Sequence, residues 1–399
     1  LLDPARDKQL WTDTFDEPVA NIMDIQKRIV TAIAQAVRRE LDPAAQKRLR
    51  QMGTVNPIAH KKCMRGFKWI YDQESKDELE LAVNYFEEAI EADSTYALAH
   101  AGLGECLTQM LHFSQIPDPE HLARTGAVID RALELDSELA EVHLTRAHFL
   151  WEHQFEFPEA EESFVRALEL NPTLGQTYFY YSMYLAQVGR YEDAAAAARK
   201  AIELDPSSMW MQEVLIHPLA MAGKYDEAMA QVEATSRNYP SWSRADGWKW
   251  TIFIYQDKWE DALALLEEKD RKEMNPFDVQ NLIQCLVRAG RQNEAQAVFD
   301  SVSVDVEPGF RYFNLGASAV HLGDMELARS YCEKFKELGP PSRIHLAFLY
   351  SLLDDRDNAF ALLNELFEDK VNWVTRMGEW EKQGGGWANL VSDPRYEEM

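Results

Sequence analysis

The stretch TLGQTYFYYSMYLAQVGRYEDAAAAARKAIELDP, residues 173–206, decides the fold because it contains two amphipathic segments joined by a glycine and closed by a proline. Gly189 ends the first segment, at a position where a left-handed backbone costs glycine least. Ala194 and Ala201 place small side chains where the second segment meets the first. Pro206 ends the second segment, since proline has no amide hydrogen and restricts the residue before it. The stretch therefore predicts a pair of closely packed helices.

The pattern recurs along the chain with a period of about 34 residues. Pro172, Pro206 and Pro240 are separated by two equal intervals of this length. Small residues recur at the matching places of the neighbouring unit, as in Gly223 with Ala228. A period of this length with small residues at fixed offsets resembles the tetratricopeptide (TPR) repeat. The resemblance implies an all-α fold, a TPR superhelical solenoid of about nine helix pairs whose inner face is available to ligands.

The period is less regular outside the central units. Around residues 243–276 the pattern drifts, with Asp257 at the place that glycine holds elsewhere. The interval from Ser137 to Pro172 exceeds the period by a single residue. Within the central unit, Ala196 is expected on the outer face of its helix. We therefore expect the fold to be regular and the individual boundaries to vary.

The first residues follow another pattern. Residues 1–17 predict a β-hairpin, and helical spacing of apolar residues from Val19 predicts a helix that ends near Leu41. The segment QLWTDTFDEPVANIMDIQKRIVTAIAQAV, residues 9–37, and the ending WANLVSDPRYEEM, residues 387–399, resemble bacterial signalling proteins with a TolB-like domain followed by TPR repeats. Because a hairpin alone is marginal in water, we expect the chain to begin inside that domain, as a fragment or a processed form.

This second resemblance implies a domain organisation. Residues 1–55 would be the C-terminal portion of a TolB-like domain, the hairpin and helix remnant of an α/β domain. Residues 59–370 would form the TPR array, and residues 371–399 a C-terminal tail with a capping helix. In this family the effector at the amino terminus is a class III adenylate cyclase domain or a winged-helix DNA-binding domain. No motif of either effector lies in these residues, so neither chemistry is assigned to them.

Charge and composition narrow the class of protein. Hydrophobic residues make up 46% of the chain and charged residues 27%, which is typical of a folded globular protein. The net charge is −26; residues 1–71 carry +5 and residues 72–170 carry −18, so we expect no direct binding of nucleic acid. No apolar run approaches the roughly 18 residues that cross a bilayer. Four isolated cysteines favour free thiols and the cytoplasm, with the periplasm left open if a transmembrane helix lies upstream.

A search for catalytic and metal-binding motifs finds none. The chain has no GxSxG, no phosphate-binding loop, no HExxH and no glycine-rich dinucleotide fingerprint. His143, His148 and His153 are five residues apart, so successive side chains are turned by about 140° around a helix and do not form one metal site. We therefore expect neither an enzyme nor a metal or cofactor site within these residues.

The first helix of each pair carries the candidate binding residues. In TPR proteins ligands contact these helices, and aromatic side chains dominate binding hot spots. The residues at those places are His148, Trp151, Phe179, Tyr180, Met183, Trp210, His217, Trp248, Tyr255, Phe310, Phe313 and His321. They predict a groove for a protein or peptide partner, or for the chain's own N-terminal region; packing between neighbouring helices is the alternative. A second hypothesis makes the chain the regulatory half of a cyclase or transcription factor, in which ligand binding to the array, or its homodimerisation, controls the effector.

Overall fold

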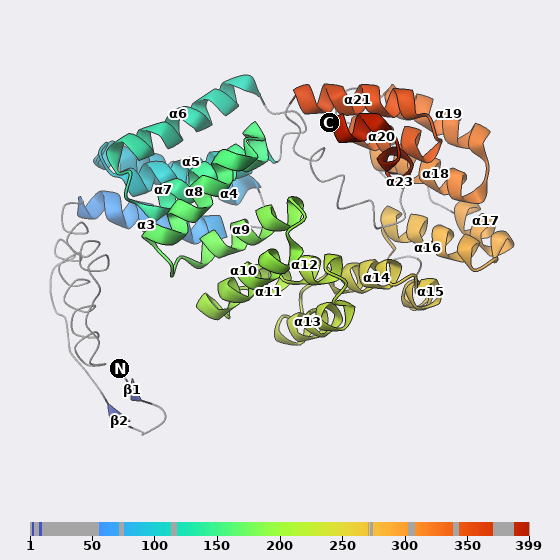
Figure 1. Ribbon diagram of the computed structural model, residues 1–399, viewed down its shortest axis with the longest axis horizontal. Helices are drawn as coiled ribbons and strands as arrows, with labels where there is room; N and C mark the ends of the chain where they lie inside the picture. The colour runs from blue at the N-terminus through green and yellow to red at the C-terminus, as the bar shows by residue number, and fades with distance from the viewer. Residues whose placement is uncertain are drawn as a thin grey trace. The chain divides into compact units, whose positions relative to one another are not determined.

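The structure, a computed structural model, is built almost entirely of helices (Figure 1). It describes residues 2–3, 8–9, 56–71, 76–112, 118–269, 271, 274–301, 308–337, 343–369 and 387–398. These residues form two compact units. The first unit ends at Pro172, and the longest segment of the second unit begins at Thr173. Each unit is described by itself below.

Nine helix pairs follow one another along the described chain, as the sequence predicted. The first unit contains three pairs: α3 (Pro57–Tyr71) with α4 (Lys76–Ala92), α5 (Ala97–Leu111) with α6 (Pro119–Leu135), and α7 (Ala140–Phe149) with α8 (Phe157–Leu170). The second unit contains six pairs: α9 (Gly175–Gln187) with α10 (Tyr191–Leu204), α11 (Met209–Glu213) and α12 (Ile216–Met221) with α13 (Tyr225–Asn238), α14 (Ala245–Tyr255) with α15 (Trp259–Glu267), α16 (Pro276–Arg288) with α17 (Gln292–Asp300), α18 (Pro308–Leu322) with α19 (Met325–Lys336), and α20 (Arg343–Leu352) with α21 (Arg356–Glu368). The all-α TPR fold of the array is thereby confirmed.

Small residues allow the two helices of a pair to nest. In α10, Ala194 and Ala201 are fully buried, whereas Ala196 is exposed, as the sequence predicted for both faces. The Ser182 hydroxyl of α9 donates to the Ala194 carbonyl oxygen at 2.8 Å, a contact that a larger residue at 194 would disturb. In the first pair the ring of Phe86, on α4, lies where a Cβ on Gly66 of α3 would be, at 2.6 Å. Backbone and side chains therefore pack closely enough that added volume is costly.

From the α7–α8 pair onward, the turn inside each pair uses a left-handed residue. Gly189 has φ of 79° and the Arg190 amide donates to the Leu185 carbonyl at 2.8 Å, which closes the helix in a Schellman motif. Asp257 has φ of 57°, so an aspartate does occupy the place that glycine holds in the neighbouring units. The drift seen in the sequence around residue 257 thus leaves the turn geometry intact.

The first helix of the α7–α8 pair absorbs the extra residue of its unit. Leu150–Gln154 form a π-helical turn, and Phe155 follows with φ of 60° at the place of the turn glycine. The Glu156 amide donates to the Leu150 carbonyl at 3.1 Å, one residue farther along the chain than in the regular turns. A π-turn accommodates one additional residue without breaking the helix. This explains why the interval between Ser137 and Pro172 exceeds the period.

A proline splits the first helix of the pair that ends with α13 into α11 and α12. Pro218 has no amide hydrogen, so the carbonyl of Val214 has no helical donor four residues on. The helix is accordingly divided into α11, which ends at Glu213, and α12, which begins at Ile216. This break lies next to the site described below.

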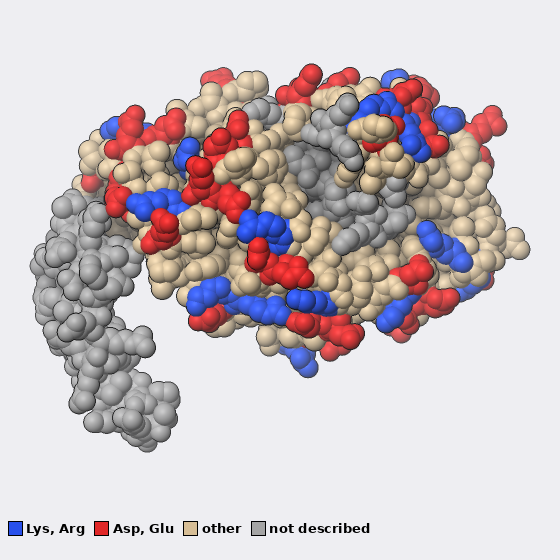
Figure 2. Space-filling model, viewed as in Figure 1, with Lys and Arg blue, Asp and Glu red and all other residues tan. Residues whose placement is uncertain are grey.

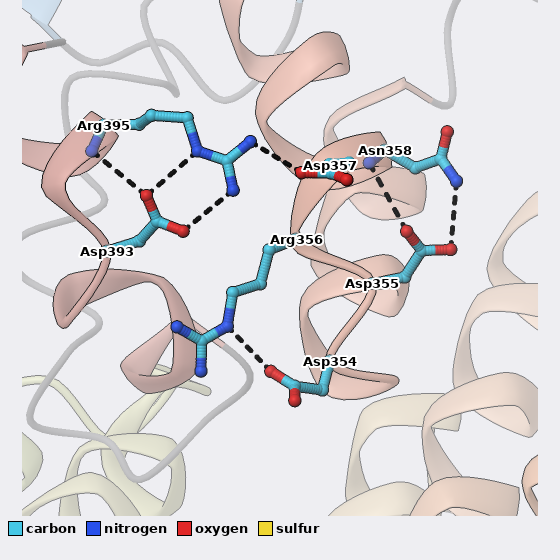
Figure 3. Close-up of polar contacts among 7 residues, drawn as sticks. All are labelled: Asp354, Asp355, Arg356, Asp357, Asn358, Asp393 and Arg395. Atoms are coloured by element: carbon cyan, nitrogen blue, oxygen red, sulfur yellow. Dashed lines mark hydrogen bonds and ion pairs between the residues drawn. The ribbon is translucent and has the colours of Figure 1, made fainter.

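The last described residues pack on the final pair. Trp387 and Leu390 are buried in the core of α18–α21, next to the short helices α23 (Ala388–Val391) and α24 (Pro394–Glu398). Arg395 holds α24 in place: its guanidinium donates to both oxygens of Asp393 and to Asp357 of α21 at 2.8 Å (Figure 3). It also lies over the Phe360 ring, 4.4 Å from the centroid. These contacts cover the apolar end of the last pair.

At the other end, β1 (Leu2–Asp3) and β2 (Lys8–Gln9) pair antiparallel, with Leu2 opposite Gln9. The remainder of the predicted hairpin and the helix predicted from Val19 lie outside the described residues. The four cysteines are buried free thiols, as predicted, and burial raises the pKa of the Cys63 thiol to about 12. In the part of the chain that the structure describes, no helix combines the length and the apolar character that a membrane crossing requires.

Candidate functional site

A buried carboxylate gathers side chains from two successive repeats of the second unit. Glu213, the last residue of α11, is 6% exposed. Its Oε1 accepts from the indole nitrogen of Trp248 on α14 at 2.8 Å, and its Oε2 accepts from the indole nitrogen of Trp242 at 2.9 Å. Oε2 also accepts from the guanidinium of Arg244. We call Trp210, Glu213, Trp242, Arg244 and Trp248 the Glu213 cluster.

Arg244 and Trp210 form the exposed side of the cluster. Arg244 immediately precedes α14, and its side chain is 49% exposed. Its guanidinium lies over the ring of Trp210, 4.7 Å from the centroid, and Trp210 is itself 36% exposed. A guanidinium held between an aromatic face and a carboxylate is fixed in orientation while still reaching solvent. Trp210 and Trp248 were both predicted as binding residues.

His217 and Tyr255 extend the surface along the same helices. The rings of His217, on α12, and Trp248 are 6.2 Å apart. The backbone carbonyl of Tyr255, the last residue of α14, accepts from the hydroxyl of Tyr225 at 3.1 Å, which ties α14 to the preceding α13. Both predicted side chains are half-buried. The predicted set of Trp210, His217, Trp248 and Tyr255 therefore lies on the first helices of two neighbouring pairs.

Three further predicted residues lie on α9, one repeat earlier. Phe179 and Tyr180 are half-buried, and their rings meet edge to face with centroids 5.1 Å apart. Met183 lies about one helical turn farther along α9 and is also half-buried. With α11, α12 and α14 they define what we call the first-helix face of the second unit. This face combines large apolar area with a few fixed polar groups, a composition typical of binding surfaces.

In the first unit the predicted residues are buried. His148, on α7, is 3% exposed, and its Nδ1 lies 2.9 Å from Oε1 of Glu105 on α5. The same oxygen accepts from the amide of Gln109 at 2.8 Å. Trp151 is 1% exposed and packs against Phe164. These side chains join neighbouring helices and offer almost no surface to a partner.

The last three predicted residues lie in the repeats nearer the C-terminus. Phe313 is buried in the core, where its ring meets that of His345 at 4.8 Å. His321 is half-buried at the end of α18; burial and the nearby charge of Arg288 lower its pKa to about 4. The side chain of Phe310 lies outside the described residues. The structure thus places the partly accessible aromatic residues on the first-helix face of the second unit.

Glu213, Trp242 and Arg244 were not among the residues predicted from the sequence. Trp242 and Arg244 precede α14, and an isolated glutamate usually indicates a solvated helix surface. The 34-residue period was the signal that could have indicated Glu213 and Arg244. Glu213 lies one full period after Phe179, and Arg244 lies one full period after Trp210. Repeating each candidate position along the array would have found both residues.

Charges elsewhere on the surface are mixed. On the face drawn in Figure 2, acidic and basic side chains are interspersed. Many of them form ion pairs, such as Arg166 with Glu138 at 2.9 Å and with Glu169 at 3.1 Å. Among the described residues no group of three His, Cys, Asp or Glu side chains is arranged to hold a metal ion. The Glu213 cluster differs from these surface pairs because its carboxylate is buried and shared by three donors.

Comparison with protein families identifies two repeats directly. Tetratricopeptide-repeat profiles match residues 175–208 and residues 311–342. The first match begins at α9 and runs to the start of α11, and therefore contains Phe179, Tyr180 and Met183. The chain thus contains TPR repeats, which form a protein–protein interaction module.

One curated relative and several solved structures are similar to parts of the chain. The Putative adenylate cyclase 3 of Rhizobium meliloti (strain 1021) is 26% identical over 148 residues, which cover 37% of this chain and 25% of that protein. The matched region thus spans about a quarter of the relative. The crystal structure of YrrB, described as a TPR protein with an unusual peptide-binding site, is 24% identical with a TM-score of 0.35, covering 46% of this chain and 89% of YrrB. Yeast Tom70 is 17% identical with a TM-score of 0.42, covering 85% of this chain and 66% of Tom70.

Proposed function

We propose that the chain is the interaction and sensing module of a bacterial signalling protein, and that a protein or peptide segment binds on the first-helix face around the Glu213 cluster. The observation that carries the proposal is the convergence of Trp242, Arg244 and Trp248 on the buried carboxylate of Glu213. Trp210 joins this group through the guanidinium of Arg244, which lies over its ring. Tryptophan side chains held in fixed orientations are frequent anchors of binding hot spots. Fixing them in the free protein reduces the entropy lost on binding.

A peptide-library selection against the 399-residue chain tests this proposal. The dissociation constants of selected peptides are then measured by calorimetry for Trp210→Ala and Trp248→Ala. Hot-spot truncations cost about 2 kcal/mol or more, so we expect binding to weaken by about tenfold or more. Trp259→Ala is a matched control, because Trp259 is also half-buried and lies 4.1 Å from an arginine, Arg288, but begins the second helix of its pair.

The control decides between a local site and a general effect. If Trp259→Ala weakens binding as much as Trp210→Ala does, the first-helix face is not the binding surface. If the selection returns no peptide whose affinity depends on Trp210 or Trp248, the proposal fails. Circular dichroism of each variant shows whether the fold is kept.

The second candidate function is the regulatory half of a class III adenylate cyclase, with a winged-helix transcriptional regulator as the alternative effector. The likeness to Putative adenylate cyclase 3 favours the cyclase. Sequencing the gene upstream of Leu1 tests it: a cyclase catalytic domain supports this candidate, and a winged helix favours the alternative. With a cyclase domain present, cyclic AMP production by the full-length protein would respond to a selected peptide and lose that response in Trp210→Ala.

We also propose the domain organisation inferred from the sequence, with a TolB-like portion at residues 1–55, the TPR array at 59–370 and a C-terminal tail at 371–399. The docking of α23 and α24 on the last helix pair supports a capping role for the tail. Limited proteolysis with mass spectrometry tests the boundaries. First cleavages within 42–58 and 370–386 would support them, whereas first cleavages inside α9–α15 would contradict them.

A further inference from the structure

We propose that Arg244 occupies, from within the chain, a slot that receives an arginine side chain of the peptide partner. The inference rests on the proposed function and specifies the chemistry of the partner: a basic peptide that carries arginine. On this proposal Arg244 is a displaceable substitute for the partner's own guanidinium. The free protein then keeps its binding slot filled until a peptide arrives.

The slot has two walls that suit a guanidinium. One wall is Oε2 of Glu213, which accepts a hydrogen bond from Arg244, and the other is the ring of Trp210, whose centroid lies 4.7 Å from the Arg244 guanidinium carbon. Trp242 and Trp248 fix the carboxylate by donating their indole N–H groups to it. A planar guanidinium can pair with a carboxylate at its edge and stack on an aromatic ring with its face. Such a slot is selective for arginine over lysine.

The Arg244 side chain makes few contacts of its own. It follows the turn after α13, its side chain is half exposed, and Glu213 is its one acidic partner among the described residues. Arg291 shows the contrast, since it pairs with both Glu267 and Glu294. An exposed side chain with a single ion pair loses little of its own when it is displaced into water, so the cost of its departure falls on the buried carboxylate of Glu213. The guanidinium of Arg244 can therefore be exchanged for another one.

The buried carboxylate requires that another cation replace Arg244. Glu213 is 6% exposed, and a buried charge left without its partner is strongly unfavourable. A neutral or acidic side chain in the slot would leave Glu213 uncompensated. The net charge of −26 also favours the approach of a basic peptide over an acidic one. The site therefore selects a cationic side chain once Arg244 moves away.

The opposite arrangement is an acidic peptide that binds to the outward N–H groups of Arg244. The two arrangements predict opposite effects of removing Arg244. If Arg244 competes with the partner, Arg244→Ala strengthens binding of an arginine peptide. If Arg244 is the anchor, Arg244→Ala weakens binding of an acidic peptide.

The experiment uses the full chain and three synthetic dodecapeptides: alternating Ala-Arg, Ala-Glu and Ala-Gln. Calorimetry gives the dissociation constant of each peptide for the unmodified chain, Arg244→Ala and Glu213→Gln. The controls are Arg237→Ala and Glu233→Gln, which change the net charge equally but lie at exposed positions of α13. They correct for the attraction of any basic peptide to an acidic chain.

We expect Arg244→Ala to bind the Ala-Arg peptide at least about tenfold more tightly, as follows if Arg244 leaves the slot open no more than about a tenth of the time. Glu213→Gln should bind it at least tenfold more weakly, while both controls change the dissociation constant less than about twofold. An effect of Arg244→Ala no larger than that of Arg237→Ala, or weaker binding, overturns the proposal. The proposal is also overturned if the Ala-Arg peptide binds measurably to neither the unmodified chain nor Arg244→Ala.

Failure of this inference can be told apart from failure of the proposed function. Preference for the Ala-Glu peptide, lost in Arg244→Ala, would overturn the slot but keep the first-helix face as the binding surface. Should Glu213→Gln not fold, as judged by circular dichroism, the comparison of Arg244→Ala with Arg237→Ala still decides the matter.

Discussion

Removing the central carboxylate of the Glu213 cluster should destabilise the second unit by about 2–4 kcal/mol, a sum of two losses. In Glu213→Ala, the indole N–H of Trp242 loses its acceptor while the side chain is 7% exposed, and an unsatisfied buried donor costs about 1–3 kcal/mol. The half-buried Trp248 and the half-exposed Arg244 can regain hydrogen bonds to water, so their losses are smaller. The smaller side chain leaves a small cavity, which adds about 1 kcal/mol.

The assay must measure this loss locally, because repeats contact mainly their neighbours and an array need not unfold in one step. Hydrogen exchange followed by mass spectrometry reports the opening of individual helices. We expect faster exchange in α11, α12 and α14 of Glu213→Ala, together with a lower urea midpoint of the second unit. Exchange in α18 and α20, several repeats away, should be unchanged.

Glu233→Ala is the matched control, because Glu233 is exposed on α13 and makes no described contact. Surface substitutions of this kind usually change stability by less than about 0.5 kcal/mol. If Glu213→Ala were as stable as Glu233→Ala, the three hydrogen bonds would not hold the two repeats together. The geometric basis of the binding site would then be wrong.

Three further predictions concern the fold. Ala201→Arg, at a fully buried position, should lower the free energy of unfolding by several kcal/mol through overpacking and a buried charge, whereas Ala196→Arg should be close to neutral. Equal urea midpoints for the two variants would contradict the helix pairing. Gly223→Ala should cost about 1–2 kcal/mol, because φ is 76° there and no atom lies within 4 Å of the added Cβ; an unchanged thermal midpoint would refute the strain. Burial and the nearby charge of Arg288 lower the pKa of His321 from its ordinary 6.5 to about 4, so the unfolded chain takes up a proton first as the pH falls. The free energy of unfolding should therefore fall from pH 6.5 to about 4, and His321→Gln should reduce that fall in urea titrations.

The repeated helix pair was predictable because its determinants are local. Gly189, Ala194 and Ala201 have the backbone angle and burial expected from the period, and Asp257 takes over the turn where glycine is missing. These features follow from steric rules that act within one pair of helices. The period of the sequence is therefore enough to predict the turn angle and the burial of these residues.

The site was only partly predictable because its polar part joins two repeats. Trp210 and Trp248 were found as aromatic residues at first-helix positions, but Glu213 resembles any solvated glutamate until Trp242 and Arg244 fold onto it. Burial depends on neighbours that the pattern of one helix does not contain. The same reason explains why Trp151 is a core residue although it shares the predicted first-helix character.

Photo-crosslinking measures most directly whether the first-helix face of the second unit receives the partner. Trp248 is replaced by the photo-crosslinking residue p-benzoylphenylalanine, with Trp259 replaced in the same way as the control, and mass spectrometry locates the attachment of a selected peptide. We expect an adduct with the peptide at position 248 that unlabelled peptide competes away, and none at position 259. Equal adducts at both positions, or adducts at position 259 alone, would contradict a binding site on this face.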